Sequence, residues 1–394
     1  MKKRILIFAL CLLGAFQTPV RCEPPAPYAA SALGGKVDVP SGRVPPSRAL
    51  FVSLIQNPPT LSSREAIMEL VDFAKKARIK ILFVQIYRAN QAWFSSKVGD
   101  PALYEAALKT LGEDPFALLI REAHKEGIEV HAWLNVLSLS ENENAPLLKK
   151  YGPDILTRNL EGKKTLEDYK IDSQYFLEPG DPRVRKELIT MVEEVVRAYP
   201  HLNGVQFDYI RYPDSHPRYG YTPVNMDRFK NSTGLKKIKE GSRAWNDWKR
   251  AQVTELLKLL VQKARAIRPE IQVSATGCMS YVRALYEAFQ DWPSWANSGL
   301  VDFVTVMNYS PDPAEYERWN EVAKAKVSDR TRLYLGIGAY KLVRSPEIFE
   351  KEFRSCEESG SGLCAVFHYG SLLENPVLER PLFPQGEGSA NAMV

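Results

Sequence analysis

Eight short apolar segments recur along the chain, and the stretches between them have the spacing of amphipathic helices. The segments span residues 50–55, 81–86, 128–135, 204–208, 271–275, 301–308, 333–339 and 363–368. Strands that are apolar along their whole length are typical of a parallel sheet covered on both faces by helices. Eight such units favour a closed (β/α)8 barrel.

An open, doubly wound sheet is the alternative. It often carries a glycine-rich phosphate loop after its first strand, and this chain has none there. We therefore expect an α/β fold, a single-domain TIM barrel over residues 48–383. Long loops follow the third strand (136–175) and the fourth (209–244). Because loops after barrel strands build the active face, we expect a substrate groove there.

The first 22 residues are typical of a secretory signal. A basic start, Lys2-Lys3-Arg4, precedes an apolar run over residues 5–16, which is too short to span a bilayer. We expect a signal peptide over 1–22, a Pro/Gly-rich linker over 23–47, a polar tail over 384–394, and a protein that is periplasmic or secreted. An uncleaved anchor is the alternative. We expect no membrane segment in the mature chain.

Charge and cysteine content exclude several partner classes. The net charge is +5, but four of the 52 basic residues lie in the first 22, which leaves 48 basic against 47 acidic residues. No basic patch favours nucleic acid. No Cys or His spacing is typical of a metal site, so we expect neither a metal nor a cofactor. Cys356 and Cys364 could pair, which would leave Cys278 buried.

Asp208 is the sharpest candidate for chemistry. It ends an apolar strand in GVQFDYIRYP, residues 204–213, where an unpaired buried carboxylate would cost several kcal/mol. The structural alternative is a scaffold partner of Arg211 or Arg88, and we favour catalysis. These arginines would hold Asp208 ionised or bind an anionic sugar substituent. Asp208 then suits a base, nucleophile or charge stabiliser better than a general acid.

Other predicted strand ends carry amides, aromatic rings and arginines. Aromatic rings stack on sugars, and amides and arginines bind hydroxyl groups. Strand alternation places Gln85 with Tyr87, and His131 with Trp133 and Asn135, on one face each. Ordinary barrel filling is the alternative for any single residue. The candidate substrate-binding residues are Gln85, Tyr87, Arg88, His131, Trp133, Asn135, Tyr209, Arg211, Asn308, Tyr309 and His368.

A glycosidase usually needs a second carboxylate. We rank Glu178 first, as the acid, because Asp181 has the position of a helix N-cap before Pro182. Asp214 lies beyond the strand, and Asp302 precedes one and so faces the opposite end. A substrate with an N-acetyl group could instead supply its own nucleophile. Tyr209, Asn135 or Tyr309 would then orient the acetamide.

Several motifs together resemble glycosyl-hydrolase-like family ten, exported bacterial TIM-barrel proteins related to glycoside hydrolases. They are FVQIYR (83–88), HKEGIEVHAWLN (124–135), PGDPRVR (179–185) and GVQFDYIRYP (204–213). The resemblance implies a (β/α)8 fold and action on a bacterial glycan, with peptidoglycan strands as the leading substrate class. Many members have a second Asp where this chain has Tyr209, and Asn where it has Glu178.

The sequence thus predicts an exported glycoside hydrolase with a polysaccharide substrate and Asp208 at its centre. A non-catalytic glycan-binding barrel is the main alternative, because it would keep the aromatic side chains without needing Asp208 for turnover. A third possibility is an enzyme with a non-sugar substrate, in which the arginines bind a phosphate or carboxylate.

Overall fold

The computed structural model describes residues 47–56, 59–214, 216–328, 331–359 and 363–383. The predicted signal peptide, the linker up to residue 46 and the tail lie outside the described residues, so these expectations stay predictions. Ser47, which we assigned to the linker, already belongs to the first strand.

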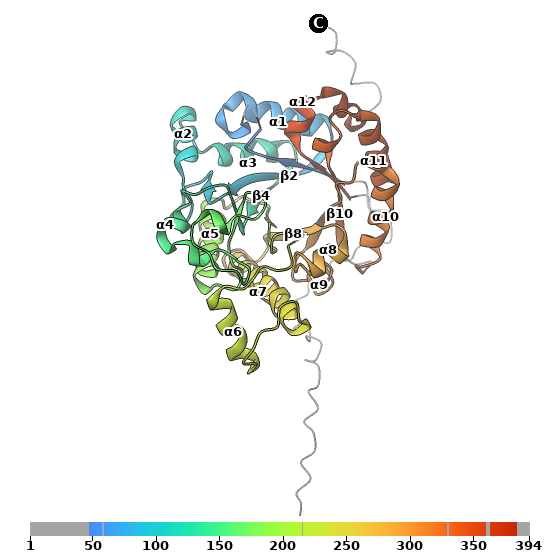
Figure 1. Ribbon diagram of the computed structural model, residues 1–394. Coiled ribbons are helices and arrows are strands. Elements are labelled where there is room, and N and C mark those ends of the chain that lie inside the picture. The colour runs from blue at the N-terminus through green and yellow to red at the C-terminus, as the bar shows by residue number, and fades with distance from the viewer. Residues whose placement is uncertain (1–46, 57–58, 215, 329–330, 360–362, 384–394) are drawn as a thin grey trace, which may run out of the picture. The chain divides into compact units, whose positions relative to one another are not determined.

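Eight parallel strands form a closed barrel, as predicted (Figure 1). The two ends of the sheet meet because β1 pairs in parallel with both β2 and β11. The register runs from Ser47 opposite Leu363 to Phe51 opposite Phe367. The strands are β1 (Ser47–Val52), β2 (Ile79–Arg88), β4 (Glu129–Asn135), β7 (Gly204–Asp208), β8 (Gln272–Cys278), β9 (Phe303–Met307), β10 (Arg332–Ile337) and β11 (Leu363–Phe367).

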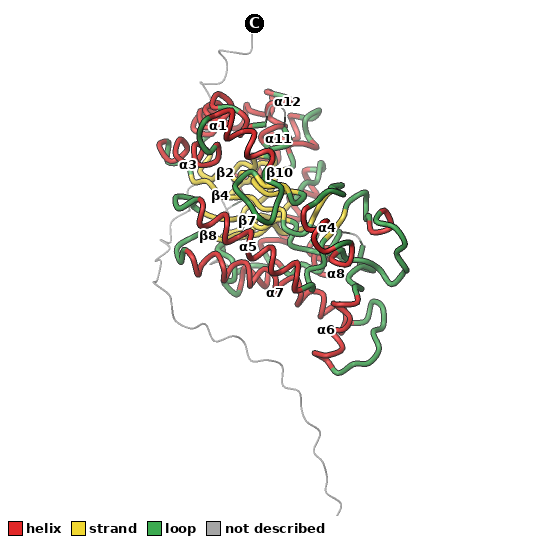
Figure 2. The backbone as a smooth tube through the Cα atoms, turned by 90° about the vertical axis from the view of Figure 1, so that its left-hand side faces the viewer, coloured by secondary structure: helices red, strands yellow, loops and turns green. Residues whose placement is uncertain are grey.

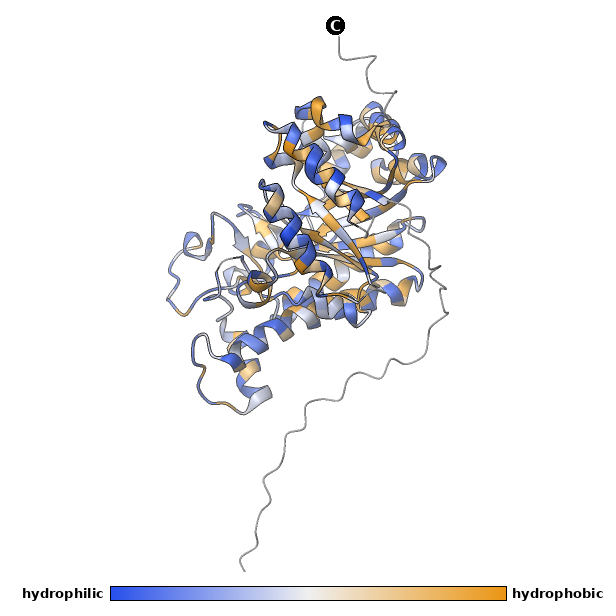
Figure 3. Cartoon of the chain, turned by 90° about the vertical axis from the view of Figure 1, so that its right-hand side faces the viewer, coloured by the Kyte–Doolittle hydropathy of each residue, from blue (hydrophilic) through white to orange (hydrophobic). Residues whose placement is uncertain are grey.

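Helices surround the strands and turn their apolar faces toward them, as the colouring of Figure 3 shows. They are α1 (Arg64–Lys76), α3 (Pro115–Lys125), α5 (Pro182–Ala198), α7 (Arg243–Ile267), α8 (Tyr281–Tyr286), α9 (Trp292–Asn297), α10 (Pro313–Lys324), α11 (Pro346–Glu358) and α12 (Tyr369–Glu374). Ser63, Asp114 and Asp181 cap three of them by accepting backbone N–H groups. None of the described helices is long and apolar enough to cross a membrane.

Aromatic side chains fill the barrel interior beneath the carboxyl ends of the strands. Alternate residues of each strand point inward, so Phe51, Phe83, Phe303 and Tyr334 meet there in one cluster with Trp133. The centroids of Phe51 and Phe83 are 4.8 Å apart, and those of Phe303 and Tyr334 are 5.1 Å apart. This apolar plug leaves only the carboxyl ends of the strands open to a ligand.

The two long insertions lie beyond the carboxyl ends of the strands (Figure 2). The first carries β5 (Ser138–Ser140), α4 (Pro146–Tyr151) and β6 (Tyr175–Phe176), and the second carries α6 (Pro223–Thr233). They contact each other through a backbone hydrogen bond of 2.8 Å from Tyr221 N to Arg158 O. A further helix, α2 (Ala102–Leu111), lies between β2 and α3 and was not predicted.

The cysteines are arranged as the sequence suggested. A disulfide joins Cys356 near the end of α11 to Cys364 in β11. Cys278, at the end of β8, is buried and free.

Candidate active site

A cleft of about 630 Å³ opens at the carboxyl ends of the strands. Most of the predicted site residues line it: Gln85, Arg88, Trp133, Asn135, Asp208, Tyr209, Arg211, Asn308, Tyr309 and His368. The rest of the lining comprises Ser53, Ile55, Asp214, Met279, Ser280, Arg283, Met307, Ser310, Pro311, Glu315, Trp319, Tyr340, Lys341 and Phe367. Tyr87, His131 and Glu178 are not among them.

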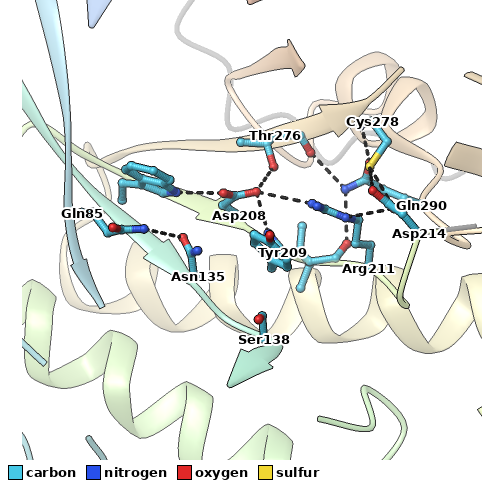
Figure 4. Close-up of polar contacts among 12 residues, drawn as sticks. Gln85, Asn135, Ser138, Asp208, Tyr209, Arg211, Asp214, Thr276, Cys278 and Gln290 are labelled. Carbon is cyan, nitrogen blue, oxygen red and sulfur yellow. Dashed lines mark hydrogen bonds and ion pairs between the residues drawn. The ribbon is translucent and has the colours of Figure 1, made fainter. Parts of the chain in front are cut away.

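Asp208 lies in this cleft and is surrounded by hydrogen-bond donors (Figure 4). Its Oδ1 accepts from Thr276 Oγ1 at 2.6 Å and from the Tyr209 backbone N at 2.7 Å. Its Oδ2 accepts from Trp133 Nε1 at 3.0 Å. Arg211 Nη1 lies 3.5 Å from Oδ1. The ionised carboxylate accepts all of these bonds, whereas a protonated one would place its own hydrogen against a donor.

The register of the barrel creates this arrangement. Asp208 is opposite Asn135 on β4, and Phe207 is opposite Ala275 on β8. Trp133 lies two residues before Asn135, and Thr276 follows Ala275 as Asp208 follows Phe207, so both side chains face the same interior as the carboxylate. Asp208 itself is only 4% exposed. The barrel thus surrounds this carboxylate with donors, which is the environment that a base, nucleophile or charge stabiliser needs.

Arg211 is the arginine that pairs with Asp208. Its Nε also lies 3.1 Å from Oδ1 of Asp214, and its guanidinium lies 4.3 Å from the centre of the Tyr209 ring. Burial would lower the pKa of Arg211, but the charges of Asp214 and Asp208 raise it well above its usual value. Of the two arginines considered for this role, the structure therefore uses Arg211, and Arg88 has no ion pair with a described residue.

Tyr209 has a backbone conformation that is rare for a bulky residue, with φ of +52°. The hydrogen bond from its N–H to Asp208 helps to hold this left-handed geometry. Such a residue costs on the order of 1–3 kcal/mol and is typical of functional sites. The strain places the Tyr209 ring in the lining of the cleft, against Arg211.

An aromatic wall lies on the β9–β11 side of the cleft. Tyr309 stacks on Phe367 with centroids 5.1 Å apart and rings inclined by 30°. Tyr340 meets both rings edge-on, at 5.7 Å from each. Burial raises the pKa of Tyr309 well above its usual value, so its phenol is neutral. A wall of this kind provides stacking surface for sugar rings.

The predicted amides and His368 are in the lining, but not all are free to bind. Asn308 Nδ2 donates to Tyr316 O at 2.8 Å and to Asn320 Oδ1 at 2.9 Å, so its donor positions hold the scaffold. Gln85 accepts from Ser53 Oγ at 3.1 Å. Burial lowers the pKa of His368, and its Nδ1 has no hydrogen-bond partner among the described residues. This nitrogen is itself buried, so only the remainder of the ring lines the cleft.

We expected Tyr87 to lie on the same face of β2 as Gln85, and it does not. The pairing of β2 with β4 shifts register between these two residues, and this irregularity breaks the alternation. The Tyr87 hydroxyl accepts a hydrogen bond of 2.9 Å from Asn90 Nδ2, and its ring packs against Gly99. Tyr87 therefore shapes the turn that leads to β3 (Gln91–Ala92) and is not in the cleft.

His131 points into the barrel but lies too deep to reach the cleft. It precedes Asn135 by four residues, which is about 13 Å along a strand. Its ring packs against Phe83 and Phe303 at centroid distances of 5.5 and 5.9 Å. Burial lowers its pKa, so the imidazole is neutral and serves the core.

Glu178, which we proposed as the acid, is buried between the two insertions and does not line the cleft. It accepts from the Tyr212 hydroxyl at 2.5 Å, from Thr157 Oγ1 at 3.1 Å and from Gly180 N at 3.3 Å. Burial raises its pKa to about 7. These contacts make it part of the scaffold. The N-cap role that we predicted for Asp181 is confirmed, because its side chain caps α5.

Sequence reasoning also missed residues of the cleft. Thr276 was lost because the predicted fifth strand stopped at residue 275, whereas β8 continues to Cys278. The alternation of Ser274 and Thr276 along that strand was the available signal. Arg283 comes from the six-residue helix α8 and Tyr340 from a single turn after β10, where periodicity carries no information, and Trp319 comes from α10. Among the described residues, no group of three or more His, Cys, Asp or Glu side chains could hold a metal ion.

A closed (β/α)8 barrel with a carboxylate and an aromatic wall at the carboxyl ends of its strands defines the protein as a glycosidase-like TIM barrel. The chain belongs to the Glycosyl hydrolase-like 10 family, whose pattern matches residues 49–355. The resemblance seen in the sequence is therefore confirmed.

Curated relatives carry matching names. Glycosyl hydrolase DigH of Escherichia coli K12 is 26% identical over 312 residues, which cover 73% of this chain and 69% of that protein. Glycosyl hydrolase YngK of Bacillus subtilis is 24% identical over 306 residues, or 71% of this chain and 56% of YngK. The chain thus spans just over half the length of YngK. The expectation of a glycosidase agrees with these names.

Solved structures confirm the fold. The catalytic domain of a β-amylase from Paenibacillus polymyxa superimposes with a TM-score of 0.54 at 12% identity, covering 86% of this chain and 95% of that one. A β-galactosidase from the psychrophilic Marinomonas ef1 gives a TM-score of 0.53 at 11% identity, covering 82% and 54%. At such low identity the likeness concerns the TIM barrel alone.

Proposed function

We propose that this protein is an exported glycoside hydrolase that cleaves a bacterial glycan, either peptidoglycan glycan strands or another amino-sugar polysaccharide. The observation that carries the proposal is Asp208, held by donors from Trp133 and Thr276, in an open cleft with an aromatic wall. Membership of the Glycosyl hydrolase-like 10 family and the names of the relatives support the reaction class. The resemblance to this family is the support for the substrate class.

Asp208 would act on the positive charge that develops during cleavage. Breaking a glycosidic bond passes through an oxocarbenium-like state, which a fixed anion stabilises and a nucleophilic carboxylate can trap. Trp133 and Thr276 hold the carboxylate in place before the substrate arrives. Arg211 balances part of its charge and so permits its burial.

The second group of the mechanism needs a new assignment, because Glu178 is outside the cleft. Asp214 lines the cleft with a side chain that is 30% exposed and lies 3.1 Å from Arg211. Glu315 also lines it, but the hydrogen bond from Ser310 lowers its pKa and favours the anion. Because Arg211 contacts both Asp208 and Asp214, whereas Glu315 pairs with Arg318, we assign Asp214 as the second carboxylate. The alternative is assistance by an N-acetyl group of the substrate, oriented by Tyr309 or Asn135.

The test is release of reducing ends from peptidoglycan strands freed of peptides, compared with glycans that lack acetamido groups. We expect release by the native protein and loss of release in Asp208→Asn. A requirement for the acetamido group would select the substrate-assisted route, and equal hydrolysis of both glycans together with inactivity of Asp214→Asn would select the two-carboxylate route. Undiminished release by Asp208→Asn would exclude Asp208 as the centre.

A non-catalytic glycan-binding barrel is the second candidate. One observation favours it, which is that Tyr209 occupies the position after Asp208 where a second carboxylate would complete an adjacent pair. Such a protein would bind glycan strands with native affinity in Asp208→Asn and release no reducing ends in either form. The same experiment therefore separates the two functions.

Export is supported by two features. The basic and apolar start of the chain is typical of a secretory signal. The disulfide between Cys356 and Cys364 is typical of proteins in an oxidising compartment. Fractionation of cells that produce the full-length chain tests this, with the processed protein expected outside the cytoplasm and its N-terminus expected near residue 23.

A further inference from the structure

The charged side chains of the cleft are not balanced. Four lining residues are cationic and three are anionic: Arg88, Arg211, Arg283 and Lys341 against Asp208, Asp214 and Glu315. Each anion has a cationic neighbour in the protein. Arg211 pairs with both aspartates, and Arg318 lies 3.4 Å from Glu315. The two aspartates share Arg211, and the four cationic against three anionic lining residues leave a net charge of +1 in the cleft.

Arg88, Arg283 and Lys341 are the unmatched cations. Their charged groups have no hydrogen bond or ion pair with another described residue, although Lys341 Nζ lies 5.9 Å from the centre of the Tyr340 ring. All three side chains line the cleft. A ligand that supplies acceptors there would provide the partners that the described part of the protein does not. The cleft therefore offers three cationic side chains that an anionic ligand could pair with.

The two arginines lie on either side of Asp208 in the barrel. Arg88 ends β2, and Arg283 belongs to α8, which follows β8. In the strand order, β4 and β7 lie between β2 and β8, and β7 ends in Asp208. A ligand that extends across Asp208 would meet one guanidinium on each side. Two separated cations suit an extended chain with several anionic groups better than one small anion.

We propose that the cleft selects glycans with carboxylate substituents on the sugar chain, and that Arg88 and Arg283 determine this specificity. The inference rests on the proposed glycan substrate and names its chemical class. Arg–carboxylate pairs are well suited to the task, because a planar guanidinium offers two parallel donors to a carboxylate. A neutral glycan would leave both arginines unpaired in the cleft.

The experiment measures binding, so that it does not depend on turnover. The protein is full-length Asp208→Asn, and the probes are peptide-free peptidoglycan strands and the same strands after their carboxyl groups have been reduced to alcohols. We expect the carboxylated strands to bind at least about tenfold more tightly at low salt, with the difference shrinking as salt is added. Arg88→Gln and Arg283→Gln, added singly, should each remove most of the difference.

Arg344→Gln is the matched control, because Arg344 is exposed and lies outside the cleft lining. It makes the same change in net charge and should keep the full preference. Equal binding of both probes, binding of neither, or an equal effect of all three substitutions would overturn the inference. A preserved carboxylate preference in a native protein that releases no reducing ends would contradict the proposed hydrolysis but not the specificity. The two failures are thus distinguishable.

Discussion

Asp208 and Glu178 are both buried carboxylates near the carboxyl ends of the strands, and their surroundings give them opposite roles. Asp208 accepts from Thr276, Trp133 and a backbone N–H, has Arg211 beside it and borders the cleft. Glu178 accepts from two hydroxyls and a backbone N–H, is 0% exposed and is not in the lining of that cleft. A raised pKa near neutrality, such as that of Glu178, is therefore not by itself a sign of catalysis.

The largest expected effect separates the two carboxylates by activity. Asp208→Asn removes the anion at the reaction centre and should lower the rate of glycan cleavage by about 10³-fold or more. Glu178→Gln keeps the shape of a side chain outside the cleft and exchanges one accepting oxygen for a donating amide, whose hydrogen bond the Thr157 hydroxyl can accept, so its rate should stay within about threefold of native. Initial rates of reducing-end release measure both. A large loss in Glu178→Gln with normal folding would contradict the comparison.

A second prediction concerns the groups that hold Asp208. Thr276→Val removes the hydroxyl 2.6 Å from Oδ1 and should lower the turnover rate by about tenfold. Thr305→Val is the matched control, because Thr305 lies inside the same barrel on β9 and its buried hydroxyl has no partner. The control should keep native activity. If the two variants behaved alike, the bond from Thr276 would have no part in positioning the carboxylate.

The smallest effect is on stability, and it concerns Glu178. Burial raises its pKa from 4.5 to about 7, so between these values the folded protein keeps a proton that the unfolded chain has released. The free energy of unfolding is therefore unaffected by this group below pH 4.5, and it falls by about 3 kcal/mol as the pH rises toward 7. Denaturant unfolding at pH 5 and pH 7.5 should show a smaller decrease for Glu178→Gln. An identical pH dependence in both proteins would refute the shift.

Much of the fold was predictable because barrel strands are buried on both faces. Continuous apolar runs located the eight strands, and the alternation along β4 and β7 placed Trp133, Asn135 and Asp208 in one interior. The positions of Tyr87 and Glu178 could not be predicted, because they depend on features that leave no pattern in the nearby sequence. The register shift in β2 turned Tyr87 away, and the packing of one insertion on the other buried Glu178. Neither is visible in a single segment.

The pairing of β1 with β11 has a consequence for how the chain is made. Its first and last strands are neighbours, so the ring cannot close until residues 363–367 have left the ribosome. Until then β1 and β10 each lack the partner that β11 provides, and the disulfide partner Cys364 is still missing. A translocation machinery that accepts only unfolded chains would therefore have nearly the whole period of translation in which to act.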